Sequence, residues 1–207
     1  MGGYTGGQRR KAEEPLAKRP FIVFALPRSR TAWASHYLSY DGERVEHDTA
    51  IHCEVPTDFL ANFAKGMRGC AETGAVIGWR FILSKLPQAK IAVIHRPLEE
   101  IKRSLAKLGM QTIEGELETR YAMLAELAQT KDIERFEFHE LNAPKHRRRL
   151  FEYCLEREWD QAWDDKLAPL NIQIDMSERL RFLASHSQQL TALKGHVASL
   201  QGHAYGG

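Results

Sequence analysis

The sequence predicts an α/β fold of three layers, with a mostly parallel sheet of about five strands and a helical C-terminal third. Short apolar runs alternate with longer segments of helical periodicity, which is typical of parallel strands joined by helices. From Pro144 onwards, helical segments dominate. A length of 207 residues, with 43% hydrophobic and 27% charged residues, is ordinary for one globular domain with a substantial core.

The strands are expected where apolar and β-branched residues cluster in short runs. These runs cover residues 20–26, 43–47, 75–79, 90–95 and 135–139, and 170–174 is a further candidate for an extended segment.

The helices are expected where apolar residues recur at helical spacing. They cover residues 31–40, 57–65, 97–108 and 115–130, followed by 145–157, 160–167 and 177–193. In the fourth of these, Leu117, Tyr121, Leu124 and Ala128 form one stripe, which predicts a face turned to the core.

The composition divides the chain into three parts. Residues 1–19 are glycine-rich and carry an excess of positive charge, and we predict a disordered basic leader, with contact to nucleic acid or an anionic surface as the alternative. Residues 20–193 are predicted to form a single α/β domain, and 194–207 a flexible C-terminal tail.

The cysteines bear on the compartment. Cys53, Cys70 and Cys154 are odd in number and lack C-x-x-C spacing, which indicates reduced thiols and a cytoplasmic location. No apolar run is long enough to span a membrane. We therefore expect neither a membrane nor a nucleic acid as a partner, and the oligomeric state stays open.

The segment Pro27-Arg28-Ser29-Arg30-Thr31-Ala32-Trp33 predicts an anion site. It follows an apolar run and leads into a helical pattern, so free N–H groups at the helix start, a guanidinium and two hydroxyls would converge there. The chain has no Gly-x-x-x-x-Gly-Lys-Ser/Thr, and the usual nucleotide triphosphate loop is not predicted.

A second anion site is predicted after the run at 90–95. Arg96 stands where this strand ends, and Ser104 falls on the apolar stripe of the following helix. Ser104 either bonds back to the carbonyl of Glu100 or donates to an anion that the Arg96 guanidinium holds. In a parallel sheet, both predicted sites lie at the carboxyl edge.

These two motifs together resemble those of sulfotransferases. Residues 27–33 resemble the 5′-phosphosulfate loop, commonly Pro-Lys/Arg-Ser-Gly-Thr-Thr-Trp, and Arg96 and Ser104 have the eight-residue spacing of the 3′-phosphate site. The resemblance covers residues 21–109 and implies a P-loop-like fold. It further implies 3′-phosphoadenosine 5′-phosphosulfate as donor, and sulfuryl transfer to a hydroxyl or amine of a small-molecule or glycan acceptor, without a metal.

The resemblance also implies roles for the loop residues. Arg28 would neutralise the leaving phosphate, and Ser29 and Thr31 would donate to the phosphosulfate, although Ser and Thr at this place are also ordinary helix caps. Trp33 would pack against the adenine, with burial in the core as the alternative.

Three departures from the family pattern bear on activity. Arg30 replaces the usual glycine and either adds a cation or blocks the site, and Ala32 replaces a threonine and removes a hydroxyl donor. The C-terminal half lacks the Arg-Lys-Gly loop that completes the nucleotide site in cytosolic sulfotransferases.

His47, at the end of the second predicted strand, is the candidate general base. Small bacterial and phage-type relatives show a similar His-Asp or His-Glu, whereas residues 78–85, which correspond to the Lys-Thr-His turn of cytosolic enzymes, contain no histidine. A structural histidine at the sheet edge is the alternative. Weaker candidates are Asp48, His52 and Glu54. With His47 and Cys53 they also suggest a metal cluster, which is disfavoured because no second cluster with ligand spacing appears and because His-x₄-His on an irregular loop is a poor zinc signature.

Two other functions compete with this hypothesis. One is a non-catalytic P-loop-like binding or structural protein, for example in a virus, which the departures at Arg30 and Ala32 motivate. The other is a small-molecule kinase, disfavoured by the missing Lys-Ser/Thr. The basic run 145–149 is predicted to be an outer helical face, and Trp159 and Trp163, four residues apart, are predicted to share a helix face in the core.

Overall fold

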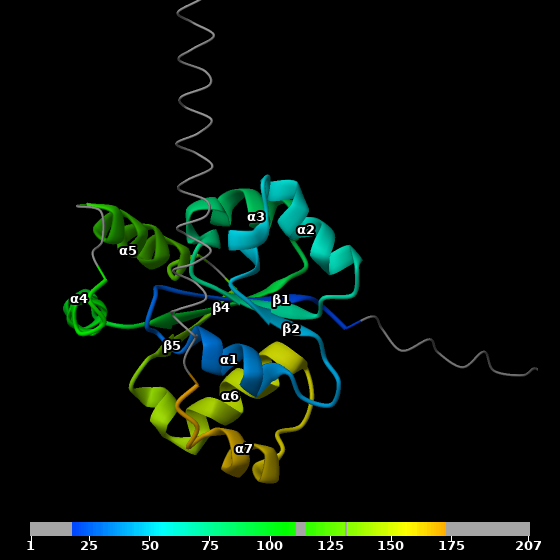
Figure 1. Cartoon of the computed structure of the whole chain (residues 1–207). Coiled ribbons are helices and arrows are strands. Elements are labelled where there is room, and N and C mark those ends of the chain that lie inside the picture. The colour runs from blue at the N-terminus through cyan, green and yellow to red at the C-terminus, as the bar shows by residue number, and fades with distance from the viewer. Residues whose placement is uncertain (1–17, 111–114, 131, 173–207) are drawn as a thin grey trace, which may run out of the picture. The chain divides into compact units, whose positions relative to one another are not determined.

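A five-stranded parallel sheet forms the middle of the computed structural model, which describes residues 18–110, 115–130 and 132–172 (Figure 1). The strand order is β2-β3-β1-β4-β5, and each neighbouring pair is parallel. The strands are β1 (Phe21–Ala25), β2 (Val45–His47), β3 (Gly69–Glu72), β4 (Lys90–His95) and β5 (Ile133–Glu137). The predicted α/β class and parallel sheet are therefore confirmed.

The central strand β1 is apolar along its whole length because both of its faces are covered. All five of its residues are buried, and it pairs with β3 on one side and β4 on the other. The ring of Phe21 lies so close to Gly69 that a Cβ there would stand 2.3 Å from a ring carbon. Only glycine therefore fits at the start of β3.

Helices cover both faces of the sheet, which gives the three predicted layers (Figure 1). On one face lie α1 (Thr31–Leu38), α6 (Pro144–Leu155) and α7 (Gln161–Leu167), and on the other α2 (Pro56–Ala64), α3 (Trp79–Lys85) and α5 (Glu116–Leu127).

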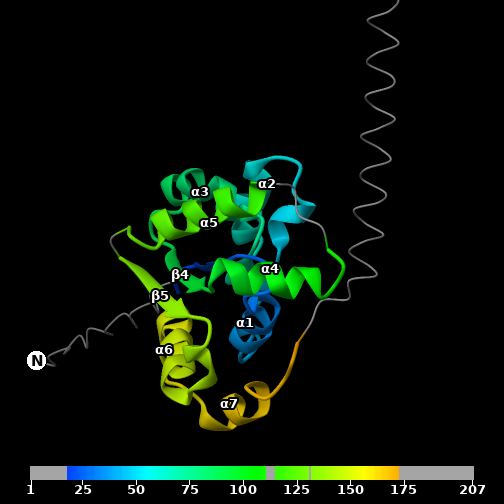
Figure 2. The same ribbon diagram turned by 90° about the vertical axis from the view of Figure 1, so that its left-hand side faces the viewer.

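Helix α4 (Leu98–Ala106) lies on neither face but beyond the carboxyl ends of the strands (Figure 2). Three short 3₁₀ helices, η1 (Thr49–His52), η2 (Ala75–Gly78) and η3 (Glu140–Asn142), follow β2, β3 and β5 at that same edge.

The strand predicted at 75–79 is wrong. Those residues form η2 and the start of α3, and the third strand is instead Gly69–Glu72. The apolar run at 75–79 suggested a buried strand, but only part of it is in the core: Val76 is buried, whereas the neighbouring Ile77 is 57% exposed. Gly69–Glu72 forms a strand because it is buried between two other strands, which outweighs its poor intrinsic propensity.

The basic run on α6 agrees with the predicted outer face at Lys145, Arg148 and Arg149, which are exposed, but not at Arg147. Arg147 is buried rather than on an outer face, and its guanidinium donates two hydrogen bonds to Asp164 on α7, at 2.8 and 2.7 Å. The Tyr37 hydroxyl on α1 donates to the same carboxylate at 2.7 Å. Burial and this hydrogen bond raise the pKa of the Tyr37 phenol. One buried ion pair thus links the three helices of this face.

Trp159 and Trp163 do not share a helix, because Trp159 precedes the first residue of α7. Both indole N–H groups instead donate to Tyr37, that of Trp159 to the hydroxyl at 3.1 Å and that of Trp163 to the carbonyl at 2.8 Å. The two tryptophans are half-buried and serve helix packing.

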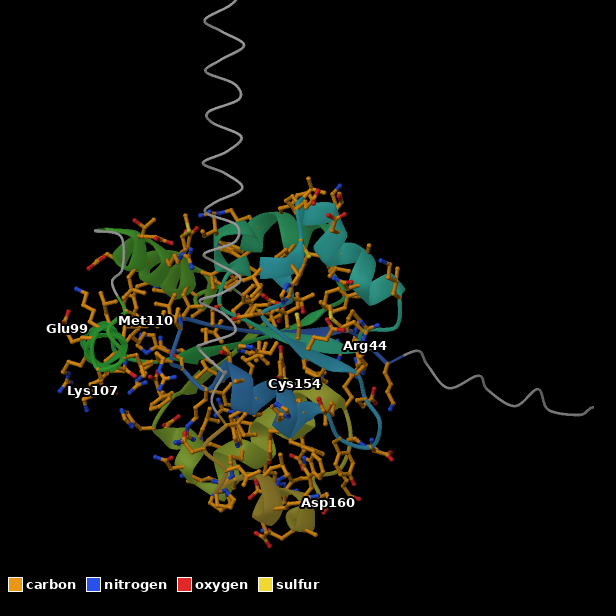
Figure 3. All side chains as sticks on the ribbon, in the orientation of Figure 1. Arg44, Glu99, Lys107, Met110, Cys154 and Asp160 are labelled. Atoms are coloured by element: carbon orange, nitrogen blue, oxygen red, sulfur yellow. The ribbon has the colours of Figure 1, made fainter. Side chains whose placement is uncertain are left out.

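The three cysteines are free thiols in the described part of the chain. Cys154 lies in the layer below the sheet (Figure 3) and is completely buried, which raises the pKa of its thiol. None of the described helices is long and apolar enough to cross a membrane.

The predicted leader and tail fall largely outside the described residues. Lys18 and Arg19 are described, and they pair with Glu43 and Glu156 respectively. The described elements belong to one compact unit that ends at Pro169, and a second unit begins at Leu170. Residues 170–172 form neither helix nor strand, and 173–207, including the predicted helix 177–193, lie outside the description.

Candidate functional site

The loop between β1 and α1 has a backbone that non-glycine residues rarely adopt. Arg28 and Arg30 both have φ of 66°, in the left-handed region. Each such residue costs about 1–2 kcal/mol relative to a right-handed conformation, and strain of this kind concentrates at binding sites. Arg30 thus has a backbone conformation that favours glycine, the residue that the family motif commonly has at this place.

Ser29, between these two arginines, is the most conspicuous polar group of the loop. It is completely buried, and its hydroxyl has no hydrogen-bond partner in the described part of the protein. A buried hydroxyl without a partner costs about 1–3 kcal/mol, and a ligand that accepted a hydrogen bond from Ser29 would remove this cost.

The start of α1 has no side-chain cap. Its N-cap residue is Arg30, whose side chain makes no capping hydrogen bond, and the first turn carries no acidic residue. The alternative interpretation of Ser29 and Thr31 as ordinary N-caps is therefore wrong. The uncapped N–H groups and the positive end of the helix dipole favour an anion here.

The second predicted anion motif meets this loop directly. The Arg28 Nε donates to the Ser104 Oγ of α4 over 3.2 Å, and an Arg96 guanidinium N–H donates to the carbonyl oxygen of Arg28. The Ser104 hydroxyl is therefore turned to the loop. Two motifs far apart in the sequence form one cluster at the carboxyl edge of the sheet.

The cluster is rich in positive charge. Burial, and next the charge of Arg96, lower the pKa of Arg28. Burial, followed by the charges of Arg147 and Arg96, lowers the pKa of Arg30. Cations that disfavour one another's charge in this way would be stabilised by a bound anion.

Glu100 supplies a carboxylate to this cluster. It lies 3.3 Å from the Arg96 Nε and accepts a hydrogen bond from the His139 ring at 2.9 Å, and the hydrogen bond from His139 is the main cause of its lowered pKa. Arg96 is thus held from two sides, by the Arg28 carbonyl and by Glu100.

Phe138, just after β5, was not predicted as a site residue. The Arg96 guanidinium lies 4.1 Å and the Arg30 guanidinium 5.0 Å from the centroid of its ring, and Arg30 also donates to Asn142. Cation–π contacts of this kind orient both arginines. The sequence carried no local signal for this role, because it depends on β4 and β5 being neighbours.

His47 ends β2, and its ring reaches the loop. Its Nε2 lies 2.9 Å from the Thr31 hydroxyl and 3.8 Å from a carboxylate oxygen of Asp48. Asp48 is buried, and its other oxygen accepts from the backbone N–H and hydroxyl of Thr73 at 2.8 and 2.7 Å. The structure therefore brings His47 to the loop, on the side opposite β4.

The weaker candidates for the base are arranged differently. His52 and Glu54 are exposed on and after η1, and the Cys53 thiol donates to the Thr49 carbonyl at 3.3 Å. Within the described residues, no three His, Cys, Asp or Glu side chains lie together in a metal-binding arrangement.

Trp33 is 4% exposed and belongs to the core. Its ring stacks on Tyr37 with centroids 4.5 Å apart, and its indole N–H donates to the Leu167 carbonyl at 3.0 Å. This is the core alternative that the sequence left open. Its neighbour Ala32 is half-buried in the first turn of α1.

Glu72, the last residue of β3, was also missed from the sequence. It is completely buried and accepts from the backbone N–H groups of Thr49 and Ala50 at 2.7 and 3.3 Å. Burial, reinforced by the nearby Asp48 carboxylate, raises the pKa of Glu72 to about 8. No local signal pointed to Glu72, because the strand that it ends was itself not predicted.

His95, directly before Arg96, was missed as well. Its Nδ1 lies 2.9 Å from a Glu137 carboxylate oxygen and its Nε2 2.7 Å from the Tyr121 hydroxyl, so it connects β4, β5 and α5. The hydrogen bonds that Glu137 accepts from His95 and Arg135 lower its pKa, even though burial opposes them.

Comparisons with known proteins identify no family. No protein-family model matches the chain, and no curated protein matches it. Among solved structures, a sulfotransferase from Alicyclobacillus acidocaldarius matches 86% of this chain and 96% of its own, at 13% identity and a TM-score of 0.49.

Two kinase structures are similar to a comparable degree. An unliganded sugar kinase from Janibacter sp. HTCC2649 matches 68% of this chain and 94% of its own, at 15% identity and a TM-score of 0.47. A gluconokinase from Sinorhizobium meliloti 1021 matches 80% of this chain and 97% of its own, at 12% identity and a TM-score of 0.43.

Proposed function

We propose that this chain is a sulfotransferase that uses 3′-phosphoadenosine 5′-phosphosulfate as donor and a hydroxyl or amine of a small molecule or glycan as acceptor. The observation that carries the proposal is the contact of the two anion motifs, in which Arg28 donates to Ser104 while Arg96 donates to the Arg28 carbonyl. A nucleotide with phosphates at both the 5′ and 3′ positions suits such a pair of adjacent sites.

The loop would hold the 5′ side of this donor. Ser29 would donate its unpartnered hydroxyl, and the uncapped N–H groups of α1 would point at the same oxygens. Arg28 would neutralise the charge that builds on the bridging oxygen. Arg96 and Ser104 would bind the 3′-phosphate, the first by charge and the second by a hydroxyl.

His47 would act as the general base. The acceptor oxygen or nitrogen forms a bond to sulfur while the bond between sulfur and the bridging oxygen breaks, and that oxygen keeps the electron pair as the 5′-phosphate leaves. The acceptor proton passes to the His47 ring. Because the His47 Nε2 lies 2.9 Å from the Thr31 hydroxyl, this ring reaches the loop where the reacting group would lie.

Phosphoryl transfer from ATP is the competing reaction. The loop lacks the lysine that holds the β- and γ-phosphates in P-loop kinases. The two buried carboxylates near the loop, Asp48 and Glu72, are occupied by Thr73 and by backbone N–H groups. These observations favour a sulfuryl donor over a magnesium nucleotide.

The test is formation of 3′-phosphoadenosine 5′-phosphate from the sulfated donor, with a panel of phenols, sugars and amines as acceptors, in the wild type and His47→Gln. We expect acceptor-dependent turnover that falls by about 10²–10⁴-fold in His47→Gln, with nucleotide binding retained. Acceptor-dependent consumption of ATP with Mg²⁺ instead would identify a kinase. No turnover with either donor would favour the non-catalytic alternative.

A further inference from the structure

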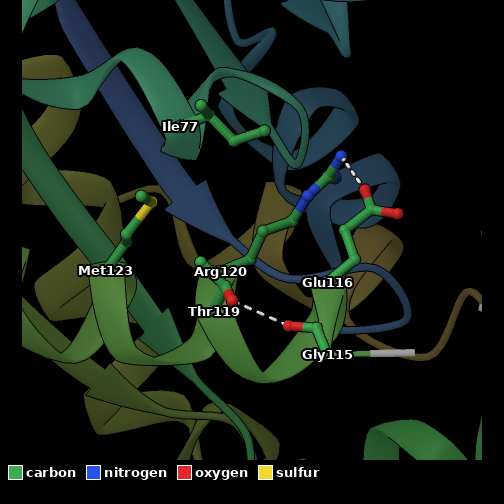
Figure 4. Close-up of a pocket in the computed structure, with 6 residues that line it drawn as sticks. All are labelled: Ile77, Gly115, Glu116, Thr119, Arg120 and Met123. Atoms are coloured by element: carbon green, nitrogen blue, oxygen red, sulfur yellow. Dashed lines mark hydrogen bonds and ion pairs between the residues drawn. The ribbon is translucent and has the colours of Figure 1, made fainter. Parts of the chain in front are cut away.

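A pocket of about 450 Å³ opens between η2 and the first turns of α5, apart from the arginine cluster (Figure 4). Its lining is formed by Ile77, Gly115, Glu116, Thr119, Arg120 and Met123.

Both walls of this pocket, α5 and η2, contact elements that lead to the proposed donor site. The Tyr121 hydroxyl of α5 bonds to His95, the residue before Arg96, and Glu118 of α5 pairs with Lys102 of α4 at 2.8 Å. On the opposite wall, η2 follows β3 and packs against β1, the strand that leads into the loop. Because η2 begins just after β3 ends, this wall of the pocket lies at the carboxyl edge of the sheet, as the two predicted anion motifs do.

The lining combines an apolar surface with one charged pair. Ile77 presents a side chain that is 57% exposed, an unusual position for isoleucine, and Met123 adds a flexible apolar surface. Arg120 pairs with Glu116 at 2.5 Å through one terminal nitrogen (Figure 4), whereas its Nε is buried and has no hydrogen-bond partner among the described residues. This guanidinium has a donor to spare.

We propose that the pocket binds the acceptor, and that this acceptor is an amphipathic organic acid with an apolar body and one carboxylate. Its body would pack on Ile77 and Met123, and its carboxylate would accept from the guanidinium of Arg120, which lines the pocket. The role as acceptor rests on the proposed sulfuryl transfer, but binding of the acid does not.

The binding test uses 4-hydroxyphenylacetate as probe and its neutral isostere 4-hydroxyphenylacetamide as comparison, both titrated by calorimetry without nucleotide. Arg120→Met removes the charge at similar length. Arg80→Met is the matched control, because Arg80 on α3 also pairs with a glutamate of α5, Glu126, but does not line the pocket.

We expect the acid to bind the wild type more tightly than the amide does. Arg120→Met should weaken binding of the acid by about tenfold or more and change binding of the amide by less than about twofold. Arg80→Met should change binding of either compound by less than about twofold. Unchanged binding of the acid in Arg120→Met, or equal loss for acid and amide, overturns the proposal. Binding of the amide also reports whether Arg120→Met is folded.

A parallel titration with 3′-phosphoadenosine 5′-phosphate separates this inference from the proposed function. If the nucleotide binds and the acid does not, the pocket is not an acceptor site and the donor assignment stands. If the acid binds with the expected dependence on Arg120 and the nucleotide does not, the sulfotransferase proposal fails while the organic-acid site stands.

Discussion

The Arg28 side chain donates from Nε to the Ser104 hydroxyl over 3.2 Å, and this bond joins the loop after β1 to helix α4. Neither residue is remarkable in isolation, since one is an arginine in a turn and the other a serine on an amphipathic helix. Together they connect the proposed 5′ and 3′ sides of a single nucleotide site.

Ser104→Ala should weaken binding of 3′-phosphoadenosine 5′-phosphate by about tenfold or more, because a hydroxyl donor to a charged group contributes about 1.5–3 kcal/mol. Binding of adenosine 5′-phosphate should change little. Calorimetric titration of both nucleotides checks this. Arg103→Ala, an exposed change on the same helix, is the control, and equal weakening of the two nucleotides by Ser104→Ala would argue against a 3′-phosphate contact.

Arg30→Gly should be more stable than Arg30→Ala by about 1 kcal/mol, since both lose the same side-chain contacts but only glycine adopts a φ of 66° without strain. Urea unfolding of the two variants measures the difference. Equal stability of Arg30→Ala and Arg30→Gly would contradict a left-handed backbone at residue 30.

Glu72 should make the protein less stable as the pH rises. Its folded pKa of about 8 lies above the ordinary value of 4.5, so its contribution is fully present below about pH 4.5 and is lost as the pH rises through 8. Glu72→Gln keeps a neutral side chain and should gain stability relative to wild type across that window, with a slope of at most about 1.4 kcal/mol per pH unit.

Urea unfolding of wild type and Glu72→Gln at several pH values between 5 and 8.5 measures this slope, taken as the difference between the two proteins. Glu126→Gln, which removes a half-exposed carboxylate from α5, controls for the loss of a negative charge. A difference between wild type and Glu72→Gln that stays constant with pH would contradict a raised pKa.

Arg147→Ala should lower the free energy of unfolding by about 3–5 kcal/mol, because it leaves the Asp164 carboxylate buried without its partner. Arg148→Ala on the same helix removes a largely exposed arginine that pairs with Glu152 one turn away, and should cost about 0.5 kcal/mol or less. Thermal unfolding of both variants measures the contrast. Similar losses in the two would show that the α1–α6–α7 face does not depend on this pair.

The sequence predicted four of the five strands near their observed positions and missed β3. The runs at 20–26 and 90–95 became β1 and β4, since central parallel strands are apolar along their length. Gly69–Glu72 escaped prediction because its strand character comes from its neighbours: Phe21 fills the space above Gly69, and the flanking strands supply the hydrogen bonds.

Parts of the candidate site depend on tertiary contacts that no spacing encodes. The positions of Arg28, Arg96 and Ser104 at one edge followed from the parallel topology, and the structure brings them into contact. The role of Phe138 depends on β5 lying beside β4. The burial of Arg147 depends on Asp164, whose carboxylate lies 17 residues further along the chain. Local patterns cannot indicate either.

The central claim is that one site holds both a 5′ and a 3′ phosphate, and calorimetric titration with 3′-phosphoadenosine 5′-phosphate against adenosine 5′-phosphate tests it most directly. We expect one nucleotide per chain and a preference of about tenfold or more for the nucleotide with the 3′-phosphate, which Arg96→Ala abolishes and Arg103→Ala preserves. Equal affinity for the two nucleotides, or a preference that survives in Arg96→Ala, would contradict the account.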